Sequence, residues 1–236
     1  MNLAGFQATT LIDFPGRVAA TLFAAGCNFR CPFCHNAELV IPERVRELSP
    51  VDSERVLEEL ERRRGFLDGV VLTGGEPTLQ EDLGDFIARL RGLGFLVKLD
   101  TNGSRPEVVR SLVDDELVDY VAVDVKAPPN RYAEFAGVEV PADAIERTVT
   151  ILRESRVEYE FRTTVAPGLA EDDLEAIAAW LRPARRYVLQ AFRVPGEPGK
   201  ALLDPSWATR EGLKPRELRR AWAKIESGFE SGGVRA

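Results

Sequence analysis

The sequence has few of the residues that usually bind metals or form disulfides, with one histidine and three cysteines in 236 residues. All three cysteines lie in the stretch from Cys27 to Cys34. An odd number of cysteines this close together excludes the disulfide framework of a small secreted domain. We therefore expect a reducing compartment, the cytoplasm.

Long apolar runs and an excess of basic residues are also missing. No window of about 18 apolar residues exists, so we expect no transmembrane helix, and residues 1–7 lack the pattern of a signal peptide. A formal net charge of -7 argues against binding to a nucleic-acid backbone, which requires a basic face. The apolar fraction of 44% is ordinary and sufficient for a full hydrophobic core.

From residue 18 onward, apolar runs of strand length alternate with amphipathic helical patterns. We expect six strands, at residues 18–23, 69–73, 95–99, 120–125, 158–165 and 187–192. We expect helices at residues 53–64, 80–93, 105–112, 143–153, 174–181 and 214–228. A short N-terminal segment covers residues 1–16, a loop rich in Gly and Pro covers 195–205, and no break in composition divides the single domain at 1–236.

Strands separated by helices imply parallel pairing with right-handed crossovers, in a doubly wound sheet or a barrel. Four polar clusters follow the first four strands. They are the cysteine loop, Gly74-Gly75-Glu76-Pro77, Asp100-Thr101-Asn102, and Asp124 with Lys126. Because the carboxyl ends of parallel strands share one edge in either fold, we expect these clusters to form one site.

The cysteines follow the pattern C-x₃-C-x₂-C. A structural zinc ion takes four ligands, and here it would find three sulfurs and at best His35. A 4Fe–4S cluster is normally held by four thiolates, so three would leave one iron open for chemistry. The spacing favours a reactive cluster, with a zinc site and inert buried thiols as the alternatives.

C-x₃-C-x₂-C after an apolar strand is the signature of the radical S-adenosylmethionine (SAM) superfamily. Together with Thr10-Leu11-Ile12-Asp13-Phe14-Pro15-Gly16 and Leu22-Phe23, it resembles the activating proteins of anaerobic ribonucleoside-triphosphate reductase, relatives of the pyruvate formate-lyase activating enzymes. The resemblance is dense over residues 10–126. It implies an α/β fold, a partial (β/α)₆ barrel, that holds a 4Fe–4S cluster on Cys27, Cys31 and Cys34 and binds S-adenosylmethionine.

The resemblance also implies an activity and partners. Reductive cleavage of S-adenosylmethionine would generate a glycyl radical on the anaerobic ribonucleotide reductase, with a flavodoxin or ferredoxin type electron donor. The alternatives are a small-molecule radical enzyme resembling 7-carboxy-7-deazaguanine synthase, and a non-enzymatic zinc or iron–sulfur binding module. No further cysteine exists for an auxiliary cluster of the ferredoxin type.

The same resemblance gives roles to individual residues. The turn Gly74-Gly75-Glu76 would receive the methionine amino group, and Lys126 would meet the carboxylate. Further cofactor contacts are implied for Phe33, His35, Asn102, Asp124, Arg162 and Gln190. Asp100, Thr101 and Asp124 resemble a monovalent-cation site. The structural alternative is that Lys126 simply pairs with one of the two aspartates.

Overall fold

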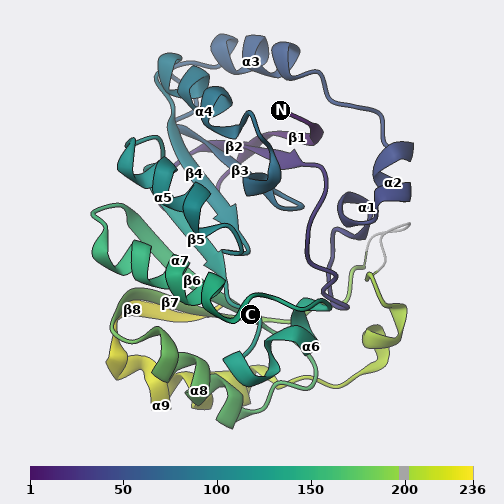
Figure 1. The fold of residues 1–236 in the computed structure, drawn as a ribbon, viewed down its shortest axis with the longest axis vertical. Helices are drawn as coiled ribbons and strands as arrows, with labels where there is room; N and C mark the ends of the chain where they lie inside the picture. Colours follow the sequence, from purple (N-terminus) through teal and green to yellow (C-terminus); the bar gives the residue numbers. More distant parts are fainter. Residues whose placement is uncertain (197–201, 236) are drawn as a thin grey trace.

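The computed structural model describes residues 1–196 and 202–235, so part of the expected 195–205 loop lies outside the described residues. One sheet of eight strands in sequential order forms the frame (Figure 1). The strands are β1 (Leu3–Thr10), β2 (Ala19–Ala24), β3 (Gly69–Gly74), β4 (Leu96–Thr101), β5 (Tyr120–Asp124), β6 (Glu158–Val165), β7 (Ala184–Ala191) and β8 (Phe229–Arg235).

Helices follow most of the strands, as the alternating pattern predicts. The α-helices are α1 (Ala37–Val40), α2 (Pro42–Glu47), α3 (Ser53–Arg62), α4 (Leu83–Gly92), α5 (Pro106–Asp114), α6 (Tyr132–Ala136), α7 (Ala142–Glu154), α8 (Glu171–Leu181) and α9 (Pro215–Ile225). Short 3₁₀ turns lie at Pro77–Leu79, Pro129–Arg131, Pro205–Thr209 and Glu226–Gly228. None of the helices in the described ranges is long and apolar enough to cross a membrane.

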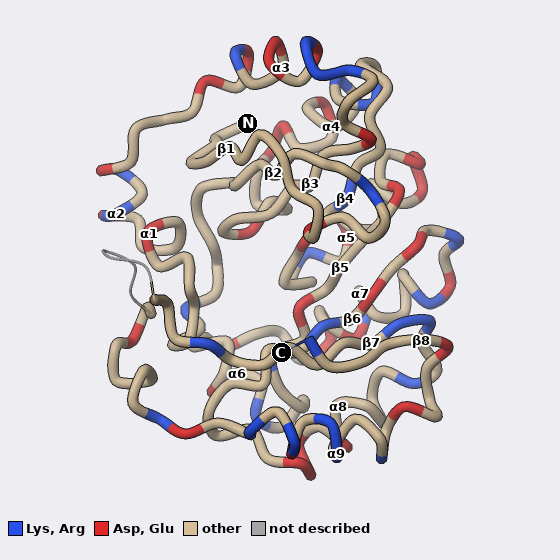
Figure 2. The backbone as a smooth tube through the Cα atoms, turned by 180° about the vertical axis from the view of Figure 1, so that it is seen from behind, with Lys and Arg blue, Asp and Glu red and all other residues tan. Residues whose placement is uncertain are grey.

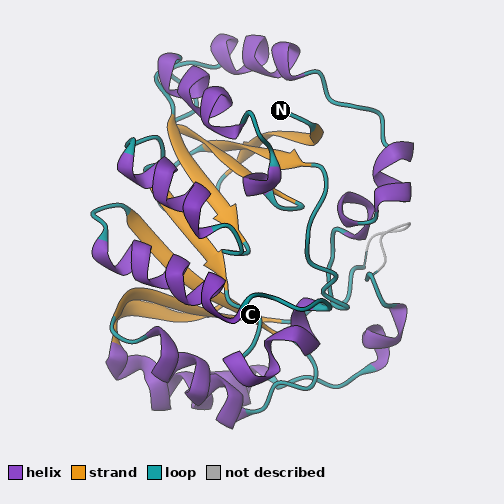
Figure 3. Cartoon of the chain, viewed as in Figure 1, coloured by secondary structure: helices purple, strands orange, loops and turns teal. Residues whose placement is uncertain are grey.

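The sheet is parallel from β2 to β8, and β1 pairs antiparallel with β2 at one edge. It curves, with α3, α4, α5, α7, α8 and α9 outside the curve and the loops that carry α1 and α2 at the opposite side (Figures 1 and 3). Among the described strands, β1 and β8 remain edges and do not pair with each other. The predicted α/β fold with a parallel sheet is therefore confirmed, in the form of an open barrel.

Two edge strands were missed by the sequence pattern. β1 occupies the expected N-terminal segment, and β8 follows a helix that ends at Ile225, not at residue 228. β8 contains Gly232 and Gly233 and is largely exposed, so it lacks the apolar run that marks a buried strand. Two short helices, α1 and α2, follow the cysteine stretch in a segment where no helix was expected.

The main hydrophobic core lies between the sheet and its outer helices. On α3, Val56, Leu57 and Leu60 are buried, as the helical period predicts, while the rest of the helix carries acidic and basic residues (Figure 2). Inside the curve, Phe14 is buried against Tyr120, with ring centroids 6.2 Å apart, at the end where the strands begin. The opposite end, where the strands finish, is left open for a site.

Candidate functional site

A cavity of about 500 Å³ lies at the carboxyl ends of the strands. This volume is within the usual range for a small-molecule site. Loops after β2 and β3 contribute Cys31, Phe33, Cys34, His35, Gly74, Gly75 and Glu76 to its walls. The later strands contribute Asp100, Thr101, Asn102, Asp124, Lys126 and Gln190. The four polar clusters thus meet at one mouth, as their positions after the strands predict.

Backbone contacts from distant parts of the chain hold the cysteine loop. The N–H groups of Leu203 and Asp204 donate to the carbonyls of Cys34 (3.1 Å) and Pro32 (2.9 Å). Trp207 follows in the same segment, and its ring lies 5.7 Å from that of Phe33. The loop therefore has a fixed shape that depends on residues far along the chain.

A second set of contacts fixes the start of the same loop. Arg30 donates through Nη1 to the carbonyls of Cys27 (2.7 Å) and Phe29 (2.8 Å), and its own N–H donates to Ala136 (2.8 Å). Gly137 is required beside it, because a Cβ there would lie 2.0 Å from the Arg30 carbonyl oxygen. The end of α6 and the cysteine loop thus fit closely together.

The three thiols are free and at least partly buried. Burial raises the pKa of Cys27 to about 11 and that of Cys31 to about 12, and it also raises the pKa of Cys34. Without metal, these groups therefore stay protonated at neutral pH, and a bound metal would have to displace the protons.

The arrangement of the thiols also bears on the kind of metal site. Among residues 1–196 and 202–235, no three His, Cys, Asp or Glu side chains gather tightly enough to hold one metal ion. A single tetrahedral zinc ion needs its ligands gathered around one point. An iron–sulfur cluster binds each thiolate through a different iron, so it accepts sulfurs that are further apart. Three thiols on one loop are a donor set that can bind three irons of a cluster and leave a fourth iron open.

The glycine turn after β3 lies directly against the start of the cysteine loop. Gly75 donates to the Ala24 carbonyl (2.8 Å), and Glu76 donates to the Gly26 carbonyl (2.7 Å). A Cβ on Gly75 would lie 1.9 Å from the Gly26 oxygen, and Gly74 has a φ of 115°. Both positions therefore require glycine, and the turn aligns two loops that border the cavity.

The Glu76 carboxylate is 1% exposed and is held by the protein itself. Its Oε1 accepts from the Thr78 N–H (3.1 Å), the Thr78 hydroxyl (2.6 Å) and the Thr101 hydroxyl (2.7 Å). Its Oε2 accepts from the Asn102 N–H (2.6 Å). Burial raises the pKa of Glu76, although these four hydrogen bonds oppose the shift. Glu76 thus ties the end of β3 to the end of β4.

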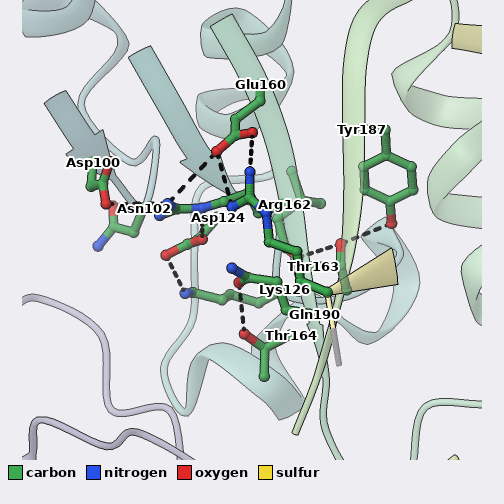
Figure 4. Close-up of polar contacts among 12 residues, drawn as sticks. Asp100, Asn102, Asp124, Lys126, Glu160, Arg162, Thr163, Thr164, Tyr187 and Gln190 are labelled. Atoms are coloured by element: carbon green, nitrogen blue, oxygen red, sulfur yellow. Dashed lines mark hydrogen bonds and ion pairs between the residues drawn. The ribbon is translucent and has the colours of Figure 1, made fainter. Parts of the chain in front are cut away.

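Charged side chains line the inside of the barrel below the cavity (Figure 4). Arg162 on β6 donates from Nε to Asp124 Oδ1 (2.9 Å) and from Nη1 to Asp100 Oδ2 (3.1 Å). Lys126 Nζ lies 3.4 Å from Asp124 Oδ2, and Lys98, which is 1% exposed, pairs with Asp100 Oδ1. We call these five residues the aspartate network.

A second group of ion pairs lies beside the aspartate network. Buried Glu160 on β6 accepts from Arg186 on β7 (3.1 Å) and from Arg235 on β8 (2.9 Å). Arg162 Nη1 is 3.9 Å from the same carboxylate. Side chains from β4 to β8 therefore form one charged layer across the barrel.

The charges of the aspartate network perturb one another. Burial alone would raise the pKa of Asp124, but the positive charges of Arg162 and Lys126 outweigh it and hold that pKa well below its ordinary value. Burial alone would lower the pKa of Lys126, but Asp124 outweighs it and raises that pKa. Asp124 and Lys126 are therefore both charged at neutral pH.

Not every predicted residue faces the cavity. Cys27 and Arg162 do not line it: Cys27 Sγ accepts from the Phe29 N–H (3.4 Å), and Arg162 lies behind the two aspartates. Phe33 lines the cavity but is 5% exposed, packed on Trp207 and Phe135, which leaves little ring surface for an adenine. Exposed His35 borders the cavity, with its ring 6.0 Å from that of Phe192.

Sequence reasoning missed several polar residues at the cavity, including two arginines and an asparagine. Arg235 reaches the wall from β8, a strand that the sequence did not predict. Asn36, beside the cysteine loop, donates to the Gly74 carbonyl (3.4 Å), and Arg193 follows β7. The motif after Cys34 could have indicated Asn36, whereas no sequence signal marks Arg193 or Arg235.

Comparisons with known proteins agree with this geometry. The model of the radical SAM superfamily matches residues 21–181. A Methanocaldococcus jannaschii protein with the provisional name glycyl-radical enzyme activating enzyme is 35% identical over 196 residues, covering 80% of this chain and 79% of its own. The 7-carboxy-7-deazaguanine synthase of Methanopyrus kandleri is 32% identical over 197 residues, covering 72% of this chain and 75% of its own.

A solved structure has a similar fold. SuiB of Streptococcus suis, in a crystal structure bound to the precursor peptide SuiA, superposes with a TM-score of 0.66 at 13% identity. The match covers 91% of this chain and 48% of SuiB, so the chain spans about half of SuiB's length. At this identity the likeness concerns the fold alone.

Proposed function

The chain belongs to the radical SAM superfamily, and on this premise we propose that it is a glycyl-radical activating enzyme that acts on anaerobic ribonucleoside-triphosphate reductase. The observation that supports the proposal is the meeting of the cysteine loop, the glycine turn and Lys126 at one open mouth. These are the parts that a reductive cleavage of S-adenosylmethionine requires, all within reach of one cavity.

Members of the superfamily use a 4Fe–4S cluster and S-adenosylmethionine. When bound, the reduced cluster would supply the electron that cleaves the sulfonium of S-adenosylmethionine and yields a carbon radical, which is the cofactors' own chemistry. We assign Cys27, Cys31 and Cys34 as the protein ligands, because three free thiols on one loop suit a cluster that takes one thiolate on each of three irons. Three protein thiolates leave one iron open to a ligand that is not from the protein.

The chain's own residues would bind and orient the cofactor. Charged Lys126 lines the cavity and suits the carboxylate of S-adenosylmethionine. The carbonyls of Gly74 and Gly75 can accept from its amino group, because no side chain blocks the approach. Gln190 lines the cavity, accepts from the Thr164 hydroxyl at 3.5 Å, and would suit the ribose or the carboxylate. The buried walls would keep water from the reactive intermediate.

A protein substrate is supported by the shape of the sheet. Because β1 and β8 do not pair with each other among the described strands, the barrel is open along one side, and the mouth is not closed by a complete ring of strands. A glycine-bearing loop of a large partner needs such a wide entrance. The electron would come from a flavodoxin or ferredoxin type donor.

A second candidate is a small-molecule radical enzyme similar to 7-carboxy-7-deazaguanine synthase. Two observations favour it. The similarity to the Methanopyrus kandleri enzyme extends over most of both chains. Arg193 lines the cavity, where it would suit an anionic substrate. Turnover of such a substrate, with no effect on the reductase, would replace the first proposal.

Anaerobic reconstitution tests the proposal. The protein should gain iron and sulfide and release 5′-deoxyadenosine on reduction with dithionite, and Cys31→Ala should lose the cluster. With the reductase added, a glycyl-type doublet should appear in the electron paramagnetic resonance spectrum. Full iron content in Cys31→Ala would contradict the ligand assignment, and no doublet with a competent reductase would contradict the proposed substrate.

A further inference from the structure

Two carboxylates end neighbouring strands at the floor of the cavity, Asp100 on β4 and Asp124 on β5. Buried charges need compensation, either from a bound ion or from other side chains. The family resemblance implies a monovalent cation held by these two residues and Thr101. The contacts within the aspartate network show whether a bound ion or the protein's own cationic side chains would compensate the two carboxylates.

The predicted ligands are engaged by other groups of the protein. The Thr101 hydroxyl donates to Glu76 Oε1 at 2.7 Å and accepts from the Gly103 N–H at 3.1 Å, so its proton and one of its two lone pairs are already used. Asp100 and Asp124 are joined by Arg162, which reaches one oxygen of each at 3.1 and 2.9 Å. The guanidinium therefore lies between the two carboxylates that a cation would have to bridge.

The remaining carboxylate oxygens also have partners. Lys98 pairs with Asp100 Oδ1, and Lys126 lies 3.4 Å from Asp124 Oδ2. All four oxygens of the two aspartates thus face cations of the protein. Two negative charges already meet three positive ones, so a further cation would gain no unpaired oxygen and would add repulsion.

We propose that Arg162 takes the place of the monovalent cation and acts as a positioning residue for the cofactor. By holding Asp124 Oδ1, it fixes the carboxylate whose other oxygen holds Lys126. Lys126 is thereby oriented toward the cavity. The inference rests on the proposed use of this cavity for S-adenosylmethionine, but it does not depend on which substrate is activated.

The proposal has a direct consequence for cofactor binding. The reconstituted wild-type protein should bind S-adenosylmethionine with the same affinity in sodium, potassium and tetramethylammonium chloride at equal ionic strength. Isothermal titration calorimetry measures this without turnover. A gain of about tenfold in affinity on adding sodium or potassium would overturn the proposal.

The variant Arg162→Gln tests whether cofactor binding comes to depend on a small cation when Arg162 is removed. The variant removes the bridging charge, so in tetramethylammonium chloride the affinity for S-adenosylmethionine should fall by about tenfold or more. Sodium or potassium should restore part of the loss, because the two carboxylates then have room for a small cation. Wild-type affinity in Arg162→Gln, whatever the salt, would also overturn the proposal.

Arg186→Gln is the matched control. Arg186 is an arginine of the same charged layer, but it pairs with Glu160 and with neither aspartate. The affinity of Arg186→Gln for S-adenosylmethionine should be the same in sodium, potassium and tetramethylammonium chloride. If sodium or potassium raised it as much as in Arg162→Gln, the result would count against a specific role of Arg162. If Arg162→Gln does not fold, as judged by circular dichroism, the wild-type salt series alone decides.

The outcomes also separate this inference from the proposed function. A wild-type protein that binds S-adenosylmethionine only when potassium or sodium is present would overturn the role of Arg162 and leave the proposed function intact. A reconstituted wild-type protein with no affinity for S-adenosylmethionine in any salt would overturn both.

Discussion

Gly75→Ala offers a sharp test of how the cavity is built. The added Cβ would lie 1.9 Å from the Gly26 carbonyl oxygen, whereas ordinary contacts are 3.4–4 Å. The obstacle is backbone and cannot turn aside as a flexible side chain would. The glycine turn and the cysteine loop would therefore have to separate by more than an ångström.

The expected cost follows from the contacts that this separation breaks. Two backbone hydrogen bonds, from Gly75 to Ala24 and from Glu76 to Gly26, hold the turn against the loop. Losing both costs about 2 kcal/mol, at about 1 kcal/mol each, and overpacking adds about 1–3 kcal/mol. We expect a loss of about 3–5 kcal/mol in the free energy of unfolding, together with weaker binding of S-adenosylmethionine.

Urea unfolding followed by circular dichroism measures the change in stability, and calorimetry measures cofactor affinity. Gly92→Ala is the matched control, since its new methyl group, at the end of α4, would meet nothing within 4 Å. In a helix, that change should stabilise the protein by up to about 1 kcal/mol. If Gly75→Ala stays within about 0.5 kcal/mol of wild type and binds the cofactor normally, the close fit of turn and loop is refuted.

Three further changes test separate parts of the structure. Lys126→Ala should raise the dissociation constant of S-adenosylmethionine by ~10-fold, as the loss of one charge-assisted contact predicts, and an unchanged value in calorimetry would leave Lys126 a purely structural role. Trp207→Ala removes a buried ring packed on Phe33 and should lower the free energy of unfolding by about 3–5 kcal/mol. The variant should also bind less iron on reconstitution. A normal iron content would show that the cysteine loop does not need this support. Hydrogen bonds from Arg220 and Lys224 lower the pKa of Glu171, so its ionised form should stabilise the protein at pH values above the ordinary pKa of a glutamate. This stabilisation should be lost as the pH falls through the lowered pKa. The melting temperatures of wild type and Glu171→Gln should therefore differ at pH 7 and converge in acid, and a difference that widens in acid would refute the expected direction.

The sequence predicts the parallel part of the fold well because burial leaves a clear pattern there. The run Val70, Val71 and Leu72 in β3 is buried throughout, as expected for a strand covered on both faces. β8 has no such apolar run, because it is an edge strand that pairs, among the described strands, only with β7 and its own side chains are largely exposed. The pairing of β8 with β7 depends on the tertiary structure of the rest of the chain, which the local sequence of β8 does not reveal.

The candidate site likewise has parts that the sequence predicted and parts that it did not. The cysteines and Gly74-Gly75-Glu76 were predicted from their order along the chain, since each follows a strand. Of the partners of Asp100 and Asp124, Lys126 was named from the sequence as pairing with one aspartate, and it lies 3.4 Å from Asp124 Oδ2. Lys98, two residues before Asp100 on β4, was not named. The contacts of Arg162 with both aspartates could not be predicted, because Arg162 comes from β6 and its neighbours depend on strand order and register. Lys98 stands in an apolar strand as if it were a surface residue, yet it is almost fully buried. Pairing inside a barrel depends on curvature and register, which periodicity does not report.

The hydrogen bonds from Leu203 and Asp204 to the cysteine loop set an order of events during biosynthesis. The ribosome releases the cysteines early, but the residues that shape their loop emerge some 170 positions later. Until then the thiols lie on an unsupported stretch of nascent chain. We therefore expect the thiols to bind iron stably only after this late segment has been synthesised and has folded against them.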